Sequence, residues 1–138
     1  MVDISLEHEY PHTAAMVWSL LANFADMNWA GIQNMAVEGS GIGMLRKIEL
    51  GMPEPVVEQL QSLDHLAMSF SYTIASGNPL PLKDYQAGAR VYAIDKTNCR
   101  VQWWCKCQVE GMTDEAIAGI LSDSYAGLLK TLAGHISA

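Results

Sequence analysis

The spacing of apolar side chains along the chain changes between two periods, and this change separates strands from helices. Apolar and polar residues alternate over 2–10, 33–38, 43–50, 56–63, 66–75, 83–95 and 99–110, which predicts β-strands. Apolar residues recur every three or four positions over 14–22 and from Thr113 to about Ser137, which predicts one short and one long helix. Residues 23–31 predict a second short helix or turn that Gly31 closes.

This order of elements is typical of an α+β fold. We expect a curved antiparallel sheet of about seven strands, wrapped around the long C-terminal helix, with the two short helices after the first strand. The helix is expected to pack on the sheet with an apolar set that consists of Ile117, Ile120, Leu121, Leu128, Leu129 and Leu132. Two breaks rich in glycine and proline, 51–55 and 76–81, predict loops, because proline lacks the N–H that a central strand needs.

The two strands that flank residues 51–55 each carry one charge within an apolar stripe. The stripes consist of Met44, Arg46, Ile48 and Leu50 on one strand and of Val56, Glu58 and Leu60 on the other. If the hairpin turns near Met52, Arg46 lies opposite Glu58. An unpaired charge on an apolar face is costly, so we expect each to pair with the other, a tyrosine, water or a ligand. The alternative is a structural ion pair at the rim of the sheet, with no ligand.

Tyrosines and small residues indicate that this face also has space. Tyr72 lies in the apolar stripe of 66–75, which runs from Leu66 through Phe70. Tyr85 precedes small residues such as Ala87, which would leave room beneath the helix. Space lined by a few polar groups is characteristic of a small-molecule site.

Composition limits the possible partners. The chain has 138 residues, 50% hydrophobic and 17% charged, which is typical of a single domain, expected to span 1–138. Eight Lys and Arg against 15 Asp and Glu give a net charge of −7, so we expect no nucleic-acid partner. No apolar run approaches the roughly 20 residues of a membrane span. The N-terminal residues lack the basic and apolar regions of a secretory signal, so we expect a cytoplasmic protein.

The cysteines do not predict a metal centre. Cys99, Cys105 and Cys107 are an odd set, and zinc needs a fourth ligand and a second close pair. We expect them to be reduced, buried thiols, and we expect neither a metal nor a cofactor. Trp103 and Trp104 point to opposite faces of their strand, so at most one of them faces the interior.

With these elements in order, nearly the whole chain resembles the START-like, helix-grip (SRPBCC) superfamily, which includes polyketide cyclases/dehydrases, birch-pollen-allergen-like proteins and plant abscisic acid receptors. Gly51-Met52-Pro53-Glu54 resembles the gate loop of the PYR/PYL-type receptors, and Ser76-Gly77-Asn78-Pro79-Leu80 stands at their latch loop. Glu58-Gln59-Leu60 and Leu82-Lys83-Asp84-Tyr85 resemble the segments that follow these loops.

The resemblance implies that Glu58 and Tyr85 contact a ligand through a polar network. It does not extend to hormone sensing. Gln33 and Asn34 stand where the receptors carry the lysine that meets the hormone carboxylate, and the latch-like segment has no His-Arg pair. The superfamily contains both binding modules and enzymes, so the fold alone does not decide between them.

The pattern and the resemblance favour binding of a small, mainly hydrophobic molecule, of the lipid, polyketide or aromatic metabolite class. The ligand would lie between the sheet and the C-terminal helix, beneath loops 51–55 and 76–81. The expected ligand-binding residues are Arg46, Ile48, Met52, Pro53, Val56, Glu58, Phe70, Tyr72, Leu80, Tyr85, Ala87, Trp103, Ile120 and Leu128.

Two other functions remain open. One is a polyketide cyclase/dehydrase or aldol-type enzyme, with Glu58 as general acid or base and Arg46 or Tyr85 stabilising an enolate. No lysine lies in an inward stripe, so a Schiff-base route is not expected. The other is a purely interacting or chaperone protein. Apolar loop tips at Met52 and Leu80 would suit a homodimer contact as well as a ligand gate.

Overall fold

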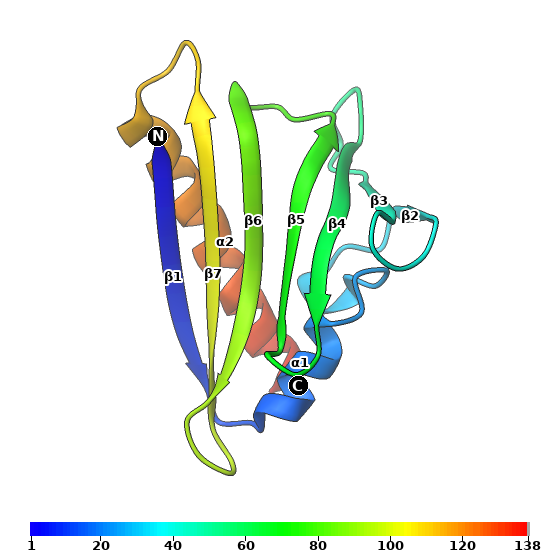
Figure 1. Ribbon diagram of the computed structural model, residues 1–138, viewed down its shortest axis with the longest axis vertical. Helices are drawn as coiled ribbons and strands as arrows, with labels where there is room; N and C mark the ends of the chain where they lie inside the picture. Colours follow the sequence, from blue (N-terminus) through cyan, green and yellow to red (C-terminus); the bar gives the residue numbers. More distant parts are fainter. Residues whose placement is uncertain (138) are drawn as a thin grey trace.

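The computed structural model describes residues 1–137, and within them seven antiparallel strands form one sheet whose inner face is crossed by a long helix (Figure 1). The elements are β1 (Val2–Tyr10), α1 (Ala14–Leu21), η1 (Asn28–Ala30), β2 (Met35–Glu38), β3 (Leu45–Ile48), β4 (Val56–Asp64), β5 (Ser69–Ser76), β6 (Leu82–Ala93), β7 (Cys99–Val109) and α2 (Asp114–Ile136). The expected α+β, helix-grip architecture is confirmed.

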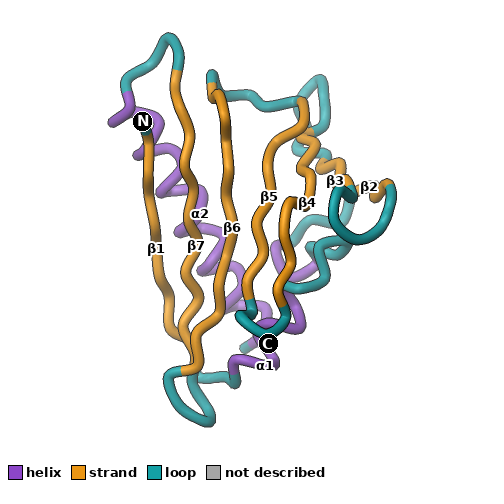
Figure 2. Tube along the Cα trace, viewed as in Figure 1, coloured by secondary structure: helices purple, strands orange, loops and turns teal. Residues whose placement is uncertain are grey.

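The strand order is β1-β7-β6-β5-β4-β3-β2, so the connection that contains α1 and η1 runs from one edge of the sheet to the other. Loops 51–55 and 76–81 lie at the same end of the sheet as the connection from β7 to α2 (Figure 2). No helix within residues 1–137 is both long enough and apolar enough to cross a bilayer.

The helices begin where the sequence predicts. The Thr113 hydroxyl accepts a hydrogen bond from the backbone N–H of Ala116 at 3.1 Å, and Asp114 and Glu115 lie in the first turn of α2. Both features satisfy or balance the unpaired N–H groups at a helix start. The second short helix is smaller than the predicted range 23–31, because only Asn28–Ala30 form a turn of 3₁₀ helix. Gly31 ends it in the left-handed conformation, with φ 74°.

Three predicted strands were too long. The strands expected over 33–38 and 43–50 are confined to Met35–Glu38 and Leu45–Ile48. The strand expected to begin at Leu66 begins only at Ser69. The Asp64 carboxylate accepts hydrogen bonds from the N–H groups of Leu66 and Ala67, both at 3.0 Å, and holds them in a turn. Leu66 is therefore 96% exposed instead of facing the core.

One buried row of α2 faces the sheet. It consists of Ile117, Leu121, Tyr125, Leu129 and Leu132. The spacing of three or four residues keeps these side chains on one side of the helix. Ile120 lies beside this row and is 43% exposed, so its predicted place in the core is wrong.

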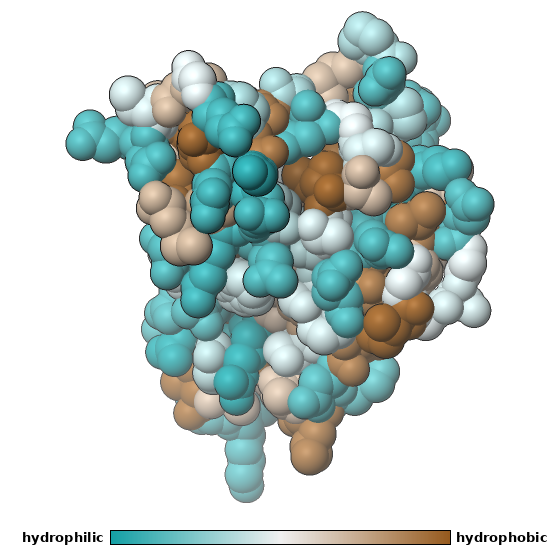
Figure 3. Space-filling view, turned by 45° about the horizontal axis from the view of Figure 1, so that its top comes forward, coloured by the Kyte–Doolittle hydropathy of each residue, from teal (hydrophilic) through white to brown (hydrophobic). Residues whose placement is uncertain are grey.

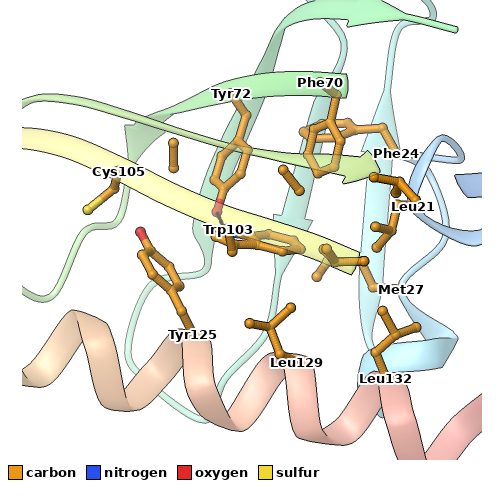
Figure 4. Packing of buried hydrophobic residues seen from close by; sticks show 14 of the residues in the cluster. Leu21, Phe24, Met27, Phe70, Tyr72, Trp103, Cys105, Tyr125, Leu129 and Leu132 are labelled. Carbon is orange, nitrogen blue, oxygen red and sulfur yellow. Dashed lines mark hydrogen bonds between the residues drawn. The ribbon is translucent and has the colours of Figure 1, made fainter. Parts of the chain in front are cut away.

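Small residues on β6 make room for rings from both neighbouring strands. Ala89 lies between Phe70 on β5 and Trp103 on β7 in the register of the sheet. The two rings approach edge to face, with centroids 5.8 Å apart, over the space that an alanine leaves (Figure 4). Trp103 is buried and Trp104 is half-buried on the opposite face. Cys99, Cys105 and Cys107 are free and buried on β7.

Candidate ligand-binding cavity

A cavity of about 290 Å³ lies between the sheet and α2. Its walls come from strands β3 to β7, from the residues on either side of η1, from the 76–81 loop and from α2. The lining residues are Met27, Ile32, Arg46, Ile48, Leu50, Val56, Glu58, Tyr72, Ile74, Asn78, Pro79, Leu80, Leu82, Tyr85, Trp103, Leu121, Ser124, Tyr125 and Leu128. Most of this lining is apolar, and the polar groups on it are few, which is typical of small-molecule sites.

The charged pair on the wall is the one predicted from the strand pattern. Arg46 lies directly opposite Glu58 in the register of β3 and β4, and Ile48 lies opposite Val56. Arg46 Nε donates to Glu58 Oε1 at 2.7 Å, although the Arg46 side chain is only 3% exposed and that of Glu58 13%. Each charge therefore compensates the other at the cavity wall.

A second nitrogen of the guanidinium is also hydrogen-bonded within the protein. Arg46 Nη1 donates to the backbone oxygen of Phe24 at 3.3 Å. The guanidinium carbon lies 3.8 Å from the centroid of the Phe24 ring and 5.4 Å from that of Tyr72. These contacts hold a buried cation between a carboxylate, a carbonyl and two aromatic faces.

Three tyrosines from three elements line the same cavity. Trp103 Nε1 donates to the hydroxyl of Tyr72 at 3.3 Å, and the hydroxyls of Tyr85 and Tyr125 share a hydrogen bond. Burial raises the pKa of Tyr72, Tyr85 and Tyr125 well above the ordinary tyrosine value. All three hydroxyls are therefore neutral at physiological pH and able to donate a hydrogen bond.

Loops 51–55 and 76–81, called the mouth loops below, touch each other at Gly77. A Cβ atom at this position would lie 1.8 Å from the backbone oxygen of Pro55, and Gly77 has φ +76°. Both the close approach and the left-handed backbone require glycine. An apolar patch is visible at this loop end of the molecule (Figure 3), where Leu50 is exposed and Leu80 is half-buried.

Nine of the expected ligand-binding residues line the cavity: Arg46, Ile48, Val56, Glu58, Tyr72, Leu80, Tyr85, Trp103 and Leu128. Five do not, and the structure places them as follows. Met52 and Pro53 line a neighbouring cleft between the two mouth loops. Phe70 packs in the core against Phe24, with ring centroids 6.2 Å apart. Ala87 lies buried on β6 between Tyr72 and Cys105, and Ile120 faces outward.

Sequence reasoning missed several lining residues, and the most important is Tyr125. Its position four residues after Leu121 and four before Leu129 was a signal that it faces the sheet. Ser124 is exposed at the edge of the cavity, and a serine on a helix gives no sign that it borders a ligand site. Met27 and Ile32 come from the connection around η1, where no regular period exists to place a side chain.

A second hollow, of about 360 Å³, lies on the opposite face of the sheet. Its side chains are mostly polar, with Ser62, Ser71, Gln86, Arg90 and Gln102 among them. None of its lining residues lies on α2, and Tyr72 is the one residue common to both linings, so the two spaces lie on opposite sides of β5 and differ in chemistry.

Comparison with known proteins agrees with this architecture. The family model described as polyketide cyclase / dehydrase and lipid transport matches residues 1–136. No curated protein sequence gives a significant match.

Solved structures share the fold at low sequence identity. A protein of Thermobifida fusca is 25% identical with a TM-score of 0.87, covering 96% of this chain and 91% of that one. A START superfamily protein of Mycobacterium smegmatis is 10% identical with a TM-score of 0.80, covering 98% and 97%. Norcoclaurine synthase of Thalictrum flavum, solved with dopamine and hydroxybenzaldehyde, is 16% identical with a TM-score of 0.75, covering 97% and 85%.

The family match covers the same span as the sheet, the cavity and α2. One of these neighbours is described as a START superfamily protein, and all three share the fold of this chain. This chain therefore belongs to the polyketide cyclase/dehydrase and lipid transport family.

Proposed function

We propose that this protein binds a small, mainly hydrophobic molecule in the cavity between the sheet and α2. The observation that carries the proposal is the cavity itself, a space of about 290 Å³ whose lining is mostly apolar. Apolar surface left in contact with water favours occupation by an apolar molecule. The volume lies near the lower end of the range of about 300–1,000 Å³ for small-molecule sites, which favours a ligand of one or two rings.

The position of the mouth also supports binding. Leu50, Pro79 and Leu80 border the cavity near the point where Gly77 touches Pro55. We infer that loops 51–55 and 76–81 cover the bound molecule and must separate for it to enter. Loops held by a few contacts on a rigid sheet are suited to such a movement.

Filling the cavity tests this function. Ser124 lies on α2 at the exposed side of the cavity and lines it, so a phenylalanine at this position would narrow the space open to a ligand. The neutral, polarity-sensitive dye prodan should bind the wild-type protein with a shift of its emission to shorter wavelength. Ser124→Phe should weaken binding at least tenfold, whereas Ala126→Phe, an exposed α2 position outside the cavity, should not. Equal binding by all three proteins would contradict the proposal.

Catalysis is the second candidate, and the position of Glu58 favours it. A carboxylate on an apolar cavity wall, beside neutral tyrosine donors, has the elements of a general base and an enolate-stabilising group. The protein should then accelerate deuterium exchange at the methyl group of methyl β-naphthyl ketone. Glu58→Gln should abolish this acceleration and retain binding of the ketone. No acceleration by the wild-type protein would reject catalysis by proton abstraction and leave the binding function standing.

A further inference from the structure

The polar end of the cavity is built from tyrosine hydroxyls rather than from charged groups. Tyr72 reaches in from β5 with its hydroxyl directed toward the helix, and Tyr125 reaches up from α2 with its hydroxyl directed toward the sheet (Figure 4). Tyr85 joins them from β6 through its hydrogen bond with Tyr125. All three side chains are buried and line the cavity.

The hydroxyl hydrogens of the three tyrosines do not all have an acceptor within the described part of the protein. Each tyrosine hydroxyl has one hydrogen to donate. Tyr72 accepts from Trp103, and its own hydrogen is within reach of the Tyr85 hydroxyl. Tyr85 and Tyr125 use one hydrogen between them. Within residues 1–137, at least one of the three hydrogens is therefore not donated to an oxygen, and the nearby thiol of Cys105 is only a weak acceptor.

The charges of the cavity wall are, by contrast, already balanced. Glu58 Oε1 is occupied by Arg46 Nε, and Arg46 also donates to the Phe24 oxygen. Among the described lining residues there is no Lys, Asp or His, and Arg46 and Glu58 supply one charge of each sign. A carboxylate or ammonium group on a ligand would therefore enter the cavity without a free counter-charge, which is strongly disfavoured.

We propose that the cavity selects an uncharged, mainly apolar molecule that carries a carbonyl-type oxygen, and that this oxygen accepts a hydrogen bond from the cluster of Tyr72, Tyr85 and Tyr125. This inference rests on the proposed function, because it names the class of molecule that the same cavity binds. Ketones, esters and quinones of one or two rings satisfy it. Free fatty acids and amines do not.

Four naphthalene probes of similar size separate the possibilities, with affinities measured by calorimetry on the full chain at neutral pH. They are methyl β-naphthyl ketone, its isosteric hydrocarbon β-isopropylnaphthalene, the anion β-naphthoate and the cation of β-naphthylmethylamine. The ketone should bind about tenfold more tightly than the hydrocarbon, because only the ketone accepts the hydrogen bonds. The acid and the amine should bind more weakly than the hydrocarbon.

Variants of the tyrosines test whether their hydroxyls cause the difference in affinity between the ketone and the hydrocarbon. Tyr125→Phe and Tyr85→Phe should each reduce the advantage of the ketone over the hydrocarbon and leave the affinity for the hydrocarbon within about twofold. Tyr92→Phe, which changes a tyrosine outside the cavity, should leave both affinities unchanged. The infrared C=O stretch of the bound ketone should lie at lower frequency in the wild-type protein than in Tyr125→Phe. Circular dichroism establishes that each variant is folded.

The outcomes distinguish this inference from the function on which it rests. Equal affinities for the ketone and the hydrocarbon, or tightest binding of the acid or the amine, overturn the inference and leave hydrophobic binding intact. An advantage of the ketone that survives both tyrosine variants also overturns it. Failure of all four probes to bind overturns the proposed function together with the inference.

Discussion

Arg46 Nε lies 2.7 Å from Glu58 Oε1, and the two residues face each other across β3 and β4 on the wall of an otherwise mainly apolar cavity. Because the Arg46 side chain is almost completely buried, neither water nor salt can replace its partner easily. We therefore expect that replacing one of the two residues alone lowers the free energy of unfolding substantially.

Removing one member should cost more than removing both. Arg46→Met leaves the Glu58 carboxylate without its counter-charge, and the free energy of unfolding should fall by about 3–5 kcal/mol. The double variant Arg46→Met with Glu58→Leu should recover most of this loss, because apolar residues of similar size often replace a buried pair without net cost. Urea denaturation measures both values. A double variant as unstable as Arg46→Met would contradict this account of the pair.

The contact between the mouth loops gives a second prediction, with a matched control in the chain. Gly77→Ala and Gly51→Ala both place a side chain on a left-handed backbone, with φ +76° and +78°. Only Gly77→Ala also creates a clash between the new Cβ and Pro55, because nothing lies within 4 Å of the Cβ position at Gly51. Gly51→Ala should cost about 1 kcal/mol, and Gly77→Ala should cost about 2 kcal/mol more. Equal losses in thermal denaturation would exclude the tight contact.

The tyrosine cluster predicts a loss of stability at alkaline pH. Burial raises the pKa of Tyr72, Tyr85 and Tyr125 above the ordinary value of 10.0. The folded state therefore holds these protons more tightly than the unfolded state does. The stabilisation is fully present below pH 10 and is lost as the pH rises beyond it.

Denaturant unfolding at a series of alkaline pH values measures this dependence, and Tyr125→Phe should make it shallower. Phenolate absorption from these three residues should appear only together with loss of helical circular dichroism. If the wild-type and Tyr125→Phe proteins lose stability with the same slope, Tyr125 does not contribute as the structure indicates.

The cysteines should be inert while the chain is folded. Cys99, Cys105 and Cys107 are buried on β7, and burial raises the pKa of the Cys105 thiol to about 11. Only the thiolate reacts with disulfide reagents. Dithiobis(nitrobenzoate) should therefore modify the native protein at the rate of unfolding and all three thiols at once in denaturant. Rapid modification of one thiol in the native protein would show that β7 is more accessible than the structure indicates.

The Arg46–Glu58 pair was predictable because strand geometry has a strict period of two. Once the hairpin at 51–55 was recognised, the face and the partner of each residue followed. The helix was harder, because Ile117, Ile120 and Leu121 all fit a helical period and only packing shows which row is buried. In the structure that row runs through Leu121 and Tyr125, and Ile120 lies beside it.

The remaining differences between prediction and structure have two causes, the geometry of a turn and the filling of space by neighbouring side chains. Leu66 fits the alternation of 66–75. The Asp64 carboxylate, however, accepts hydrogen bonds from the N–H groups of Leu66 and Ala67, which form a turn, so the strand begins at Ser69. Ala87 was expected to leave space for a ligand. A sequence does not show whether neighbouring strands fill such a space, and here the buried Tyr72 lies beside Ala87 in the sheet.

The central claim is that the cavity between the sheet and α2 binds ligand, and amide chemical shifts of the labelled protein titrated with prodan test it most directly. The shifts should saturate and should be largest for residues of the cavity wall, such as Tyr72, Tyr85 and Tyr125. Shifts confined to the hollow on the opposite face, around Gln86 and Gln102, would contradict the claim, as would their absence throughout the chain.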